Sequence, residues 1–128
     1  MTNYWRQAAI IYSFIVGLSM LGMWMFFFLA GSIPELETEP YRIAMHLVAE
    51  VVTAILLIVS AVGLWRQLHW GMTVWWVSMG MLLYTLIQSP GYFLHTGEQG
   101  LVIMFAALGV LSLVIMVGNL PNPVRPSA

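Results

Sequence analysis

A single carboxylic acid, Glu50, stands inside a hydrophobic run of this sequence that is long enough to cross a membrane. An ionisable side chain in such a run is energetically costly, so its presence indicates either a functional site or a structural contact, such as a hydrogen bond to a neighbouring helix or an ion pair, that fixes helix packing. We favour the functional site. His46 and Arg42 precede it at intervals of four residues, and an α-helix would stack the three side chains on one face. We therefore predict a polar site on this face that binds or translocates a small ligand, a proton or a cation.

The depth of this site follows from the helical rise. Glu50 would lie about 12 Å below Arg42 along a helix, at about 1.5 Å per residue. That is close to the middle of a hydrocarbon core about 30 Å thick. The next hydrophobic run would return in the opposite direction and bring Tyr84 and Thr85 near the level of Glu50, with Gln88 closer to the outer surface. We expect these three residues to contribute to the site.

The same residues suggest a metal centre as an alternative. His46 and Glu50 are spaced so that both could reach one ion from a helix, and His95 and Glu98 form a second such pair. These four residues could bind zinc or another divalent cation at the outer half of the bundle. A b-type haem between His46 and His95 is a further alternative, since bis-histidine ligation needs two imidazoles at matched depth. Our first expectation is that the protein holds no cofactor, with zinc and haem b as the two alternatives.

Composition determines the broad class of protein. Of 128 residues, 61% are hydrophobic and 7% charged, and the mean hydropathy is +0.90, whereas soluble domains carry about 25% charged residues. The chain therefore belongs in a lipid bilayer. The near-neutral net charge provides no basic surface for nucleic acid. The absence of cysteine excludes disulfides and thiolate metal ligands.

Four hydrophobic runs have the length of a membrane-spanning helix, which needs roughly 20 apolar residues. They cover about residues 8–30, 43–65, 70–88 and 100–120. We predict an all-α integral membrane protein, a single domain over residues 1–128, with four transmembrane helices in an up-down-up-down antiparallel bundle. Residues 31–42 would form an outer loop, residues 89–92 (Ser-Pro-Gly-Tyr) a turn, and residues 121–128 an exposed tail.

The orientation follows from the arginines. Arg6, Arg66 and Arg125 would all lie on one side of a four-span bundle, and this side should be cytoplasmic. Both termini are therefore predicted to be cytoplasmic, in a multi-pass protein of the cell membrane, either a plasma or an inner membrane.

In size and composition the chain is similar to the small multidrug resistance transporters, which also have four helices and a membrane-embedded glutamate. The essential glutamate of that family lies in the first helix, where this chain has none, so the mechanism of the family is not carried over to Glu50. A non-catalytic alternative is an accessory or scaffold subunit that acts as a homo-oligomer or in a larger membrane complex. No nucleophile or phosphate-binding motif is present, so we do not expect an enzyme.

Overall fold

The structure is a computed structural model and describes residues 3–31 and 35–121. It contains four long helices, α1 (Asn3–Leu29), α3 (Pro40–Trp65), α4 (Gly71–Thr96) and α5 (Gln99–Gly118), and one short helix, α2 (Glu35–Thr38). No strand occurs within those two segments. The predicted all-α class is therefore confirmed, with four long helices.

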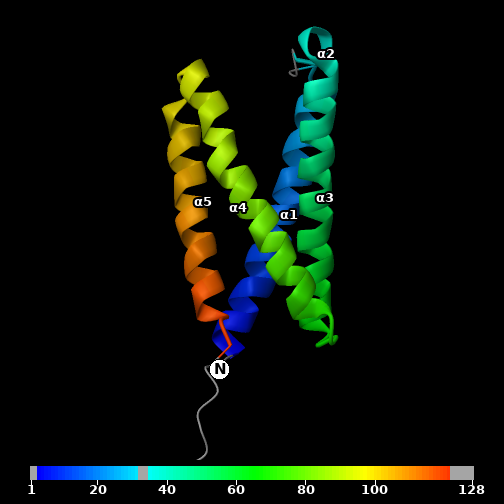
Figure 1. Cartoon of the computed structure of the whole chain (residues 1–128), viewed down its shortest axis with the longest axis vertical. Helices are drawn as coiled ribbons and strands as arrows, with labels where there is room; N and C mark the ends of the chain where they lie inside the picture. Colours follow the sequence, from blue (N-terminus) through cyan, green and yellow to red (C-terminus); the bar gives the residue numbers. More distant parts are fainter. Residues whose placement is uncertain (1–2, 32–34, 122–128) are drawn as a thin grey trace, which may run out of the picture.

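Successive long helices run in opposite directions (Figure 1). The start of α1, the α3–α4 connection and the end of α5 lie together at one end of the bundle, which we call the terminal end. The helix α2 and the α4–α5 connection lie at the opposite end, which we call the distal end. There α4 and α5 stand apart from α1 and α3, because α4 crosses the bundle obliquely (Figure 1).

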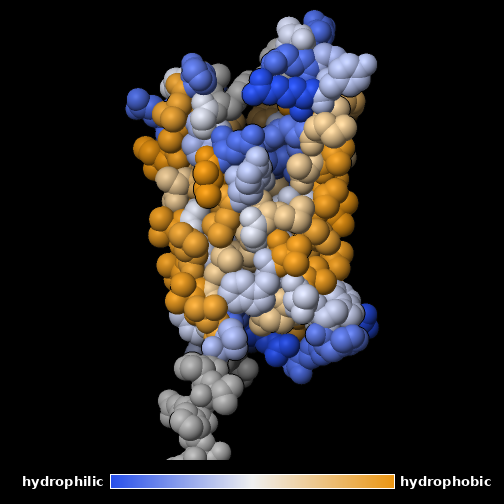
Figure 2. All heavy atoms as spheres, in the orientation of Figure 1, coloured by the Kyte–Doolittle hydropathy of each residue, from blue (hydrophilic) through white to orange (hydrophobic). Residues whose placement is uncertain are grey.

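Three helices of the described chain are long and apolar enough to cross a membrane: α1 from Tyr4, α3 and α5. The sequence led us to expect four such spans, and α4 is the exception. Its apolar residues are interrupted by polar ones such as Ser78, Thr85 and Gln88. Because α4 packs against both α3 and α5, part of its surface is covered by protein. In Figure 2, apolar atoms cover the sides of the bundle, while hydrophilic atoms gather at both ends and extend inward from the distal end.

The turn predicted at residues 89–92 is wrong, because α4 continues through Pro90 to Thr96. Proline cannot donate the backbone hydrogen bond to the carbonyl group of Leu86, but helices that pack in a membrane bundle tolerate this loss. The helix instead ends at Gly97, which adopts a left-handed conformation with φ of 79°. Glycine adopts this conformation without a steric clash, because it has no Cβ atom. The chain therefore reverses direction at Gly97 and Glu98, between α4 and α5.

The connection between α1 and α3 also differs from the predicted loop. Pro34 lies outside the described residues, but the following segment forms α2. The helix α3 then begins at Pro40, three residues earlier than predicted, with Glu39 as its N-cap residue. A proline in the first helical turn loses no hydrogen bond, and this explains the early start. The predicted tail lies outside the described residues after position 121.

The α3–α4 hairpin is tightly closed at the terminal end. A Cβ atom on Gly71 would lie 2.7 Å from the carbonyl carbon of Gly63 and 2.9 Å from the backbone nitrogen of Leu64. Only glycine therefore allows the two backbones to approach this closely. The end of α5 is fastened to the start of α1 by a hydrogen bond of 3.0 Å from Asn119 Nδ2 to the Trp5 carbonyl oxygen.

The core lies between α1, α3 and α4. Trp75 of α4 is fully buried, and its Nε1 donates a hydrogen bond of 2.9 Å to Ser13 Oγ of α1. Leu57, Met79 and Leu82 pack around it. Between these three helices, the terminal half of the bundle is therefore filled by side chains.

Candidate functional site

Glu50 is buried in α3, where only 4% of the residue is exposed. It lies ten residues after Pro40 and fifteen before Trp65, which is about 15 Å from the distal end of this helix and about 22 Å from its other end. The same face continues toward the terminal end with Thr53, Leu57 and Ser60, all buried. The polar face predicted for this helix therefore points into the protein.

His46 is the closest charged or titratable neighbour of Glu50. Its Nε2 atom lies 3.5 Å from Glu50 Oε1, as the spacing of four residues predicted. About 32% of the His46 side chain is exposed, against 5% of that of Glu50. The imidazole thus lies between the buried carboxyl group and the surroundings of the bundle.

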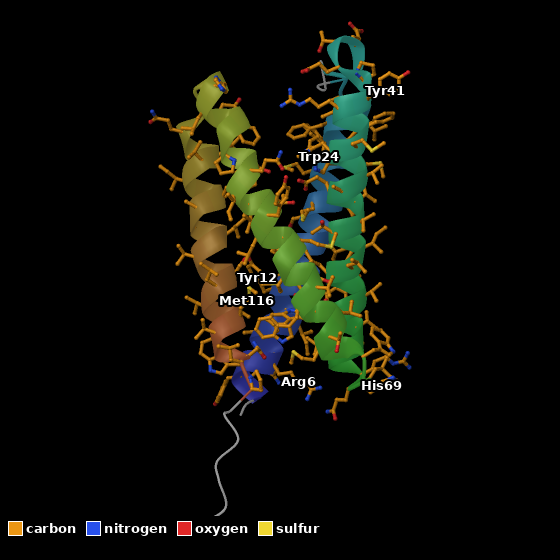
Figure 3. The ribbon with its side chains drawn as sticks, viewed as in Figure 1. Arg6, Tyr12, Trp24, Tyr41, His69 and Met116 are labelled. Carbon is orange, nitrogen blue, oxygen red and sulfur yellow. The ribbon has the colours of Figure 1, made fainter. Side chains whose placement is uncertain are left out.

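Two further helices contribute polar groups to Glu50. The Trp24 indole of α1 and the Thr85 hydroxyl of α4 both interact with its carboxyl group. Trp24 also packs edge-on against the His46 ring, with centroids 5.7 Å apart and an interplanar angle of 74°. Trp24 lies in the distal half of the molecule (Figure 3). Glu50 is therefore the point at which α1, α3 and α4 are joined by polar contacts.

The contact from Trp24 is looser than a standard hydrogen bond. Its Nε1 atom is buried and has no partner at full hydrogen-bond geometry within the described residues, although it interacts with the Glu50 carboxyl group. A buried donor without a well-formed bond is costly.

Arg42 does not belong to the site, although it shares the spacing of His46 and Glu50. Its side chain is 82% exposed and forms an ion pair of 3.3 Å with Glu39. Because Glu39 is the N-cap residue of α3, three residues away, the guanidinium group turns toward the distal end. The predicted three-residue ladder is therefore reduced to two residues, His46 and Glu50.

Of the residues predicted on α4, only Thr85 reaches Glu50. Tyr84 is 68% exposed, and Gln88 is also exposed. Consecutive residues of a helix point about 100° apart, so Tyr84 and Thr85 cannot both face the same neighbour. The prediction for Tyr84 was wrong for this reason.

The structure does not bring the four predicted metal ligands together. His95 lies in the last turn of α4 and Glu98 caps α5, and both are exposed. His95 is ten residues beyond Thr85, which corresponds to about 15 Å along the helix. In residues 3–31 and 35–121, no three His, Asp or Glu side chains are placed to hold an ion. Of the proposed centre, only the His46–Glu50 pair is assembled.

The packed core begins directly on the terminal side of Glu50. The Thr53 and Ser60 hydroxyls donate to carbonyl oxygens of their own helix, those of Ala49 and Leu57, at 2.7 Å and 2.8 Å. Ser78 of α4 does the same with the carbonyl oxygen of Val74. The hydrogen-bond donors of these hydroxyl groups are thus used within their own helices, and the small side chains allow the helices to pack together. Glu50 is therefore reached from the side of His46, not through the core.

Sequence reasoning missed Trp24, and a signal for it was present. Ser13, Gly17 and Met20 form one face of α1, and the next position on this face is Trp24. The other five tryptophans fall near the predicted cytoplasmic ends of the helices, so Trp24 alone stands apart. A tryptophan away from that end indicates a partner for its N–H group.

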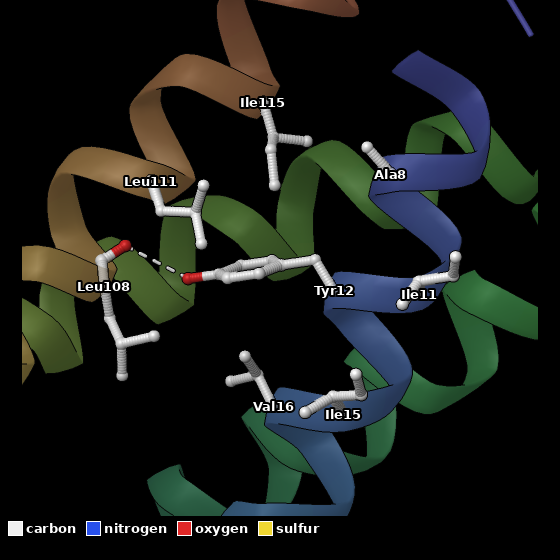
Figure 4. A pocket seen from close by; sticks show the side chains of 8 residues that line it. All are labelled: Ala8, Ile11, Tyr12, Ile15, Val16, Leu108, Leu111 and Ile115. Carbon is white, nitrogen blue, oxygen red and sulfur yellow. Dashed lines mark hydrogen bonds between the residues drawn. The ribbon is translucent and has the colours of Figure 1, made fainter. Parts of the chain in front are cut away.

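A separate hollow of about 370 Å³ opens between α1 and α5. Its lining is apolar and includes Ile11, Tyr12, Leu108 and Ile115 (Figure 4). The Tyr12 hydroxyl bonds to the Leu108 carbonyl oxygen at 3.0 Å and to Ser112 Oγ. No charged residue lines the hollow, and Glu50 is not among its lining residues. The chemistry of the candidate site therefore lies elsewhere.

Comparison with known proteins gives the family but no activity. No curated protein and no solved structure matches the chain. A family profile described as "Domain of unknown function (DUF8058)" matches residues 3–125, nearly the whole sequence. The chain therefore belongs to the DUF8058 family.

Proposed function

We propose that this chain is a multi-pass membrane protein that binds a proton at Glu50, with His46 exchanging that proton with the distal side. The observation that carries the proposal is the burial of Glu50 within 3.5 Å of a partly exposed imidazole. Histidine is the side chain whose unperturbed pKa lies nearest to neutral pH, so it is suited to pass protons to a buried acid.

The surroundings of Glu50 favour a proton over a larger ligand. His46, Trp24 and Thr85 offer hydrogen-bond donors to the carboxyl group, so few of its lone pairs are free to coordinate a cation. The described residues also supply no third acidic or histidine ligand. A proton needs neither a cavity nor additional ligands.

The orientation in the membrane rests on the arginines. Arg6 and Arg66 lie at the terminal end, whereas the distal end carries Glu37, Glu39 and Glu98 with Arg42. By the positive-inside rule the terminal end is cytoplasmic. The distal end, from which His46 adjoins the buried Glu50, then lies toward the outside of the cell membrane, and both termini are cytoplasmic. Because the side chains between α1, α3 and α4 are packed on the terminal side of Glu50, and the hollow between α1 and α5 does not include Glu50 in its lining, we propose binding from the distal side in this conformation.

Infrared difference spectroscopy of the protein in lipid vesicles tests this proposal. Spectra recorded across a pH titration should contain a carboxyl band of a buried acid that gains and loses its proton. The band should disappear in Glu50→Gln and persist in the control Glu98→Gln, since Glu98 is exposed. Identical difference spectra for the wild type and Glu50→Gln would refute the proposal.

A further inference from the structure

The polar contacts of Glu50 are placed where they could control the shape of the bundle. At the terminal end the helices are fastened by the close approach of Gly63 and Gly71 and by the bond from Asn119 to the Trp5 carbonyl group. At the distal end α4 and α5 stand apart from α1 and α3 (Figure 1). Glu50, together with Trp24 and Thr85, joins these helices at the boundary between the two regions.

We propose that protonation of the Glu50–His46 pair releases α4 and α1 from α3 and opens the distal end about the fastened terminal end. This inference rests on the proposed function, since it requires Glu50 to take up a proton. It adds a conformational response to the binding of that proton.

The chemical reason is the change in hydrogen bonding. An ionised carboxylate only accepts, so it can hold donors from three helices at once, whereas a protonated acid has become a donor itself. Protonated His46 likewise has two donors and no acceptor. Trp24 and protonated His46, which can only donate, then compete for fewer acceptor positions. The Thr85 hydroxyl can accept from the protonated acid, but that neutral bond is weaker than the charge-assisted bond it replaces. The contact of Trp24 is already loose, so it should separate first.

The groups facing Glu50 identify the titrating pair. On α1 the facing group is Trp24, and the nearest charge on that helix, Arg6, lies at the opposite end. On α3 it is His46, because Arg42 is paired with Glu39. On α4 it is Thr85, and α5 carries no charged residue within Gln99–Gly118. The response to pH should therefore depend on Glu50 and His46.

The distances between helices at the distal end and at the terminal end can be measured with pairs of spin labels on introduced cysteines, because the chain contains no native cysteine. Met45→Cys on α3 and Leu94→Cys on α4 report the distal end, and both positions are exposed. Trp65→Cys and Val117→Cys, also exposed, report the terminal end as a matched control. The distal distance should shift to longer values at acid pH, and the terminal distance should stay constant.

Two variants separate the inference from the proposed function. Glu50→Gln should hold the longer distal distance at every pH. Thr85→Val removes one donor to the Glu50 carboxyl group together with the contact to α4. It should therefore also hold the longer distal distance at every pH, while the infrared band of Glu50 remains present but titrates at a different pH. A titrating band with a constant distal distance would overturn the opening but not the proton site. A missing band would overturn the proton site and with it the opening.

Discussion

Tyr12 and Glu50 are both buried polar residues that connect helices, and they differ in chemistry. Tyr12 links α1 to α5 through the carbonyl oxygen of Leu108 and the hydroxyl of Ser112, and this link is expected to be permanent. Glu50 links α3 to α1 and α4, but a carboxyl group alters its bonds when it takes up a proton. The first residue is therefore suited to holding the fold, and the second to a change of state.

Tyr12→Phe should lower the free energy of unfolding by about 0.5–1.5 kcal/mol, the range for a hydrogen bond between membrane helices. The substitution removes the hydroxyl group and leaves Ser112, which is fully buried, without that partner. Thermal unfolding in detergent measures the effect. Tyr84→Phe is the matched control, because that side chain is 68% exposed and its substitution should change little. Equal effects of the two substitutions would contradict the role given to Tyr12.

At the scale of the elements, the terminal half of the α3–α4 hairpin is the fixed part of the bundle. The two helices meet at Gly63 and Gly71 and remain in contact up to Glu50 and Thr85. Farther along, the distal part of α4 leaves α3 and packs against α5, where Phe93 stacks on Phe105 with ring centroids 5.5 Å apart. The hairpin thus sets the position of Glu50 relative to Thr85.

Gly71→Ala should destabilise the protein by about 1–3 kcal/mol, as overpacked core substitutions do. The added Cβ atom would press on the backbone of Gly63 and Leu64, which cannot yield as a flexible side chain would. Gly80→Ala provides the control on the same helix, since its Cβ atom would meet no atom within 4 Å. That variant should be neutral or more stable by up to about 1 kcal/mol. Calorimetric unfolding of both variants would show whether the hairpin closure is as tight as described.

Hydrophobic runs were sufficient to predict the four long helices, because length and apolar composition determine them. The ends of the helices were harder to predict. Pro90 and Gly91 have the composition of a turn, yet α4 continues through them to Thr96. Tertiary packing against α5 overrides the local preference there. In the site, helical spacing correctly paired His46 with Glu50. It could not show that Arg42 turns to Glu39, because side-chain direction at a helix end depends on nearby partners.

At the scale of the whole molecule, the two ends of the bundle should lie on opposite sides of the membrane. Single cysteines in place of Glu37, Glu98 and Gln67, all exposed, can be labelled in intact cells with a maleimide that does not cross membranes. The first two lie at the distal end and should be labelled. Gln67→Cys, in the α3–α4 connection, should be labelled only after permeabilisation. Labelling of Gln67→Cys in intact cells would show that the α3–α4 connection lies outside, and the proposed topology would then be wrong.

The same experiment decides whether α4 crosses the bilayer, since it joins the Gln67 side to the Glu98 side. It is not apolar enough to be counted as a span by composition. We expect it to cross because its neighbours α3 and α5 cover its flanks. Labelling on opposite sides would establish four crossings.

We propose that Glu50 exchanges its proton with one side of the membrane only, and infrared spectroscopy of oriented vesicles can show this. Protein is reconstituted in vesicles with a uniform orientation, the pH is changed on one side at a time, and the infrared carboxyl band lost in Glu50→Gln is followed. We predict that this band responds to the pH on the distal side, where His46 is exposed, and not to the pH on the terminal side. A band that follows the terminal side, or neither side, would contradict the account.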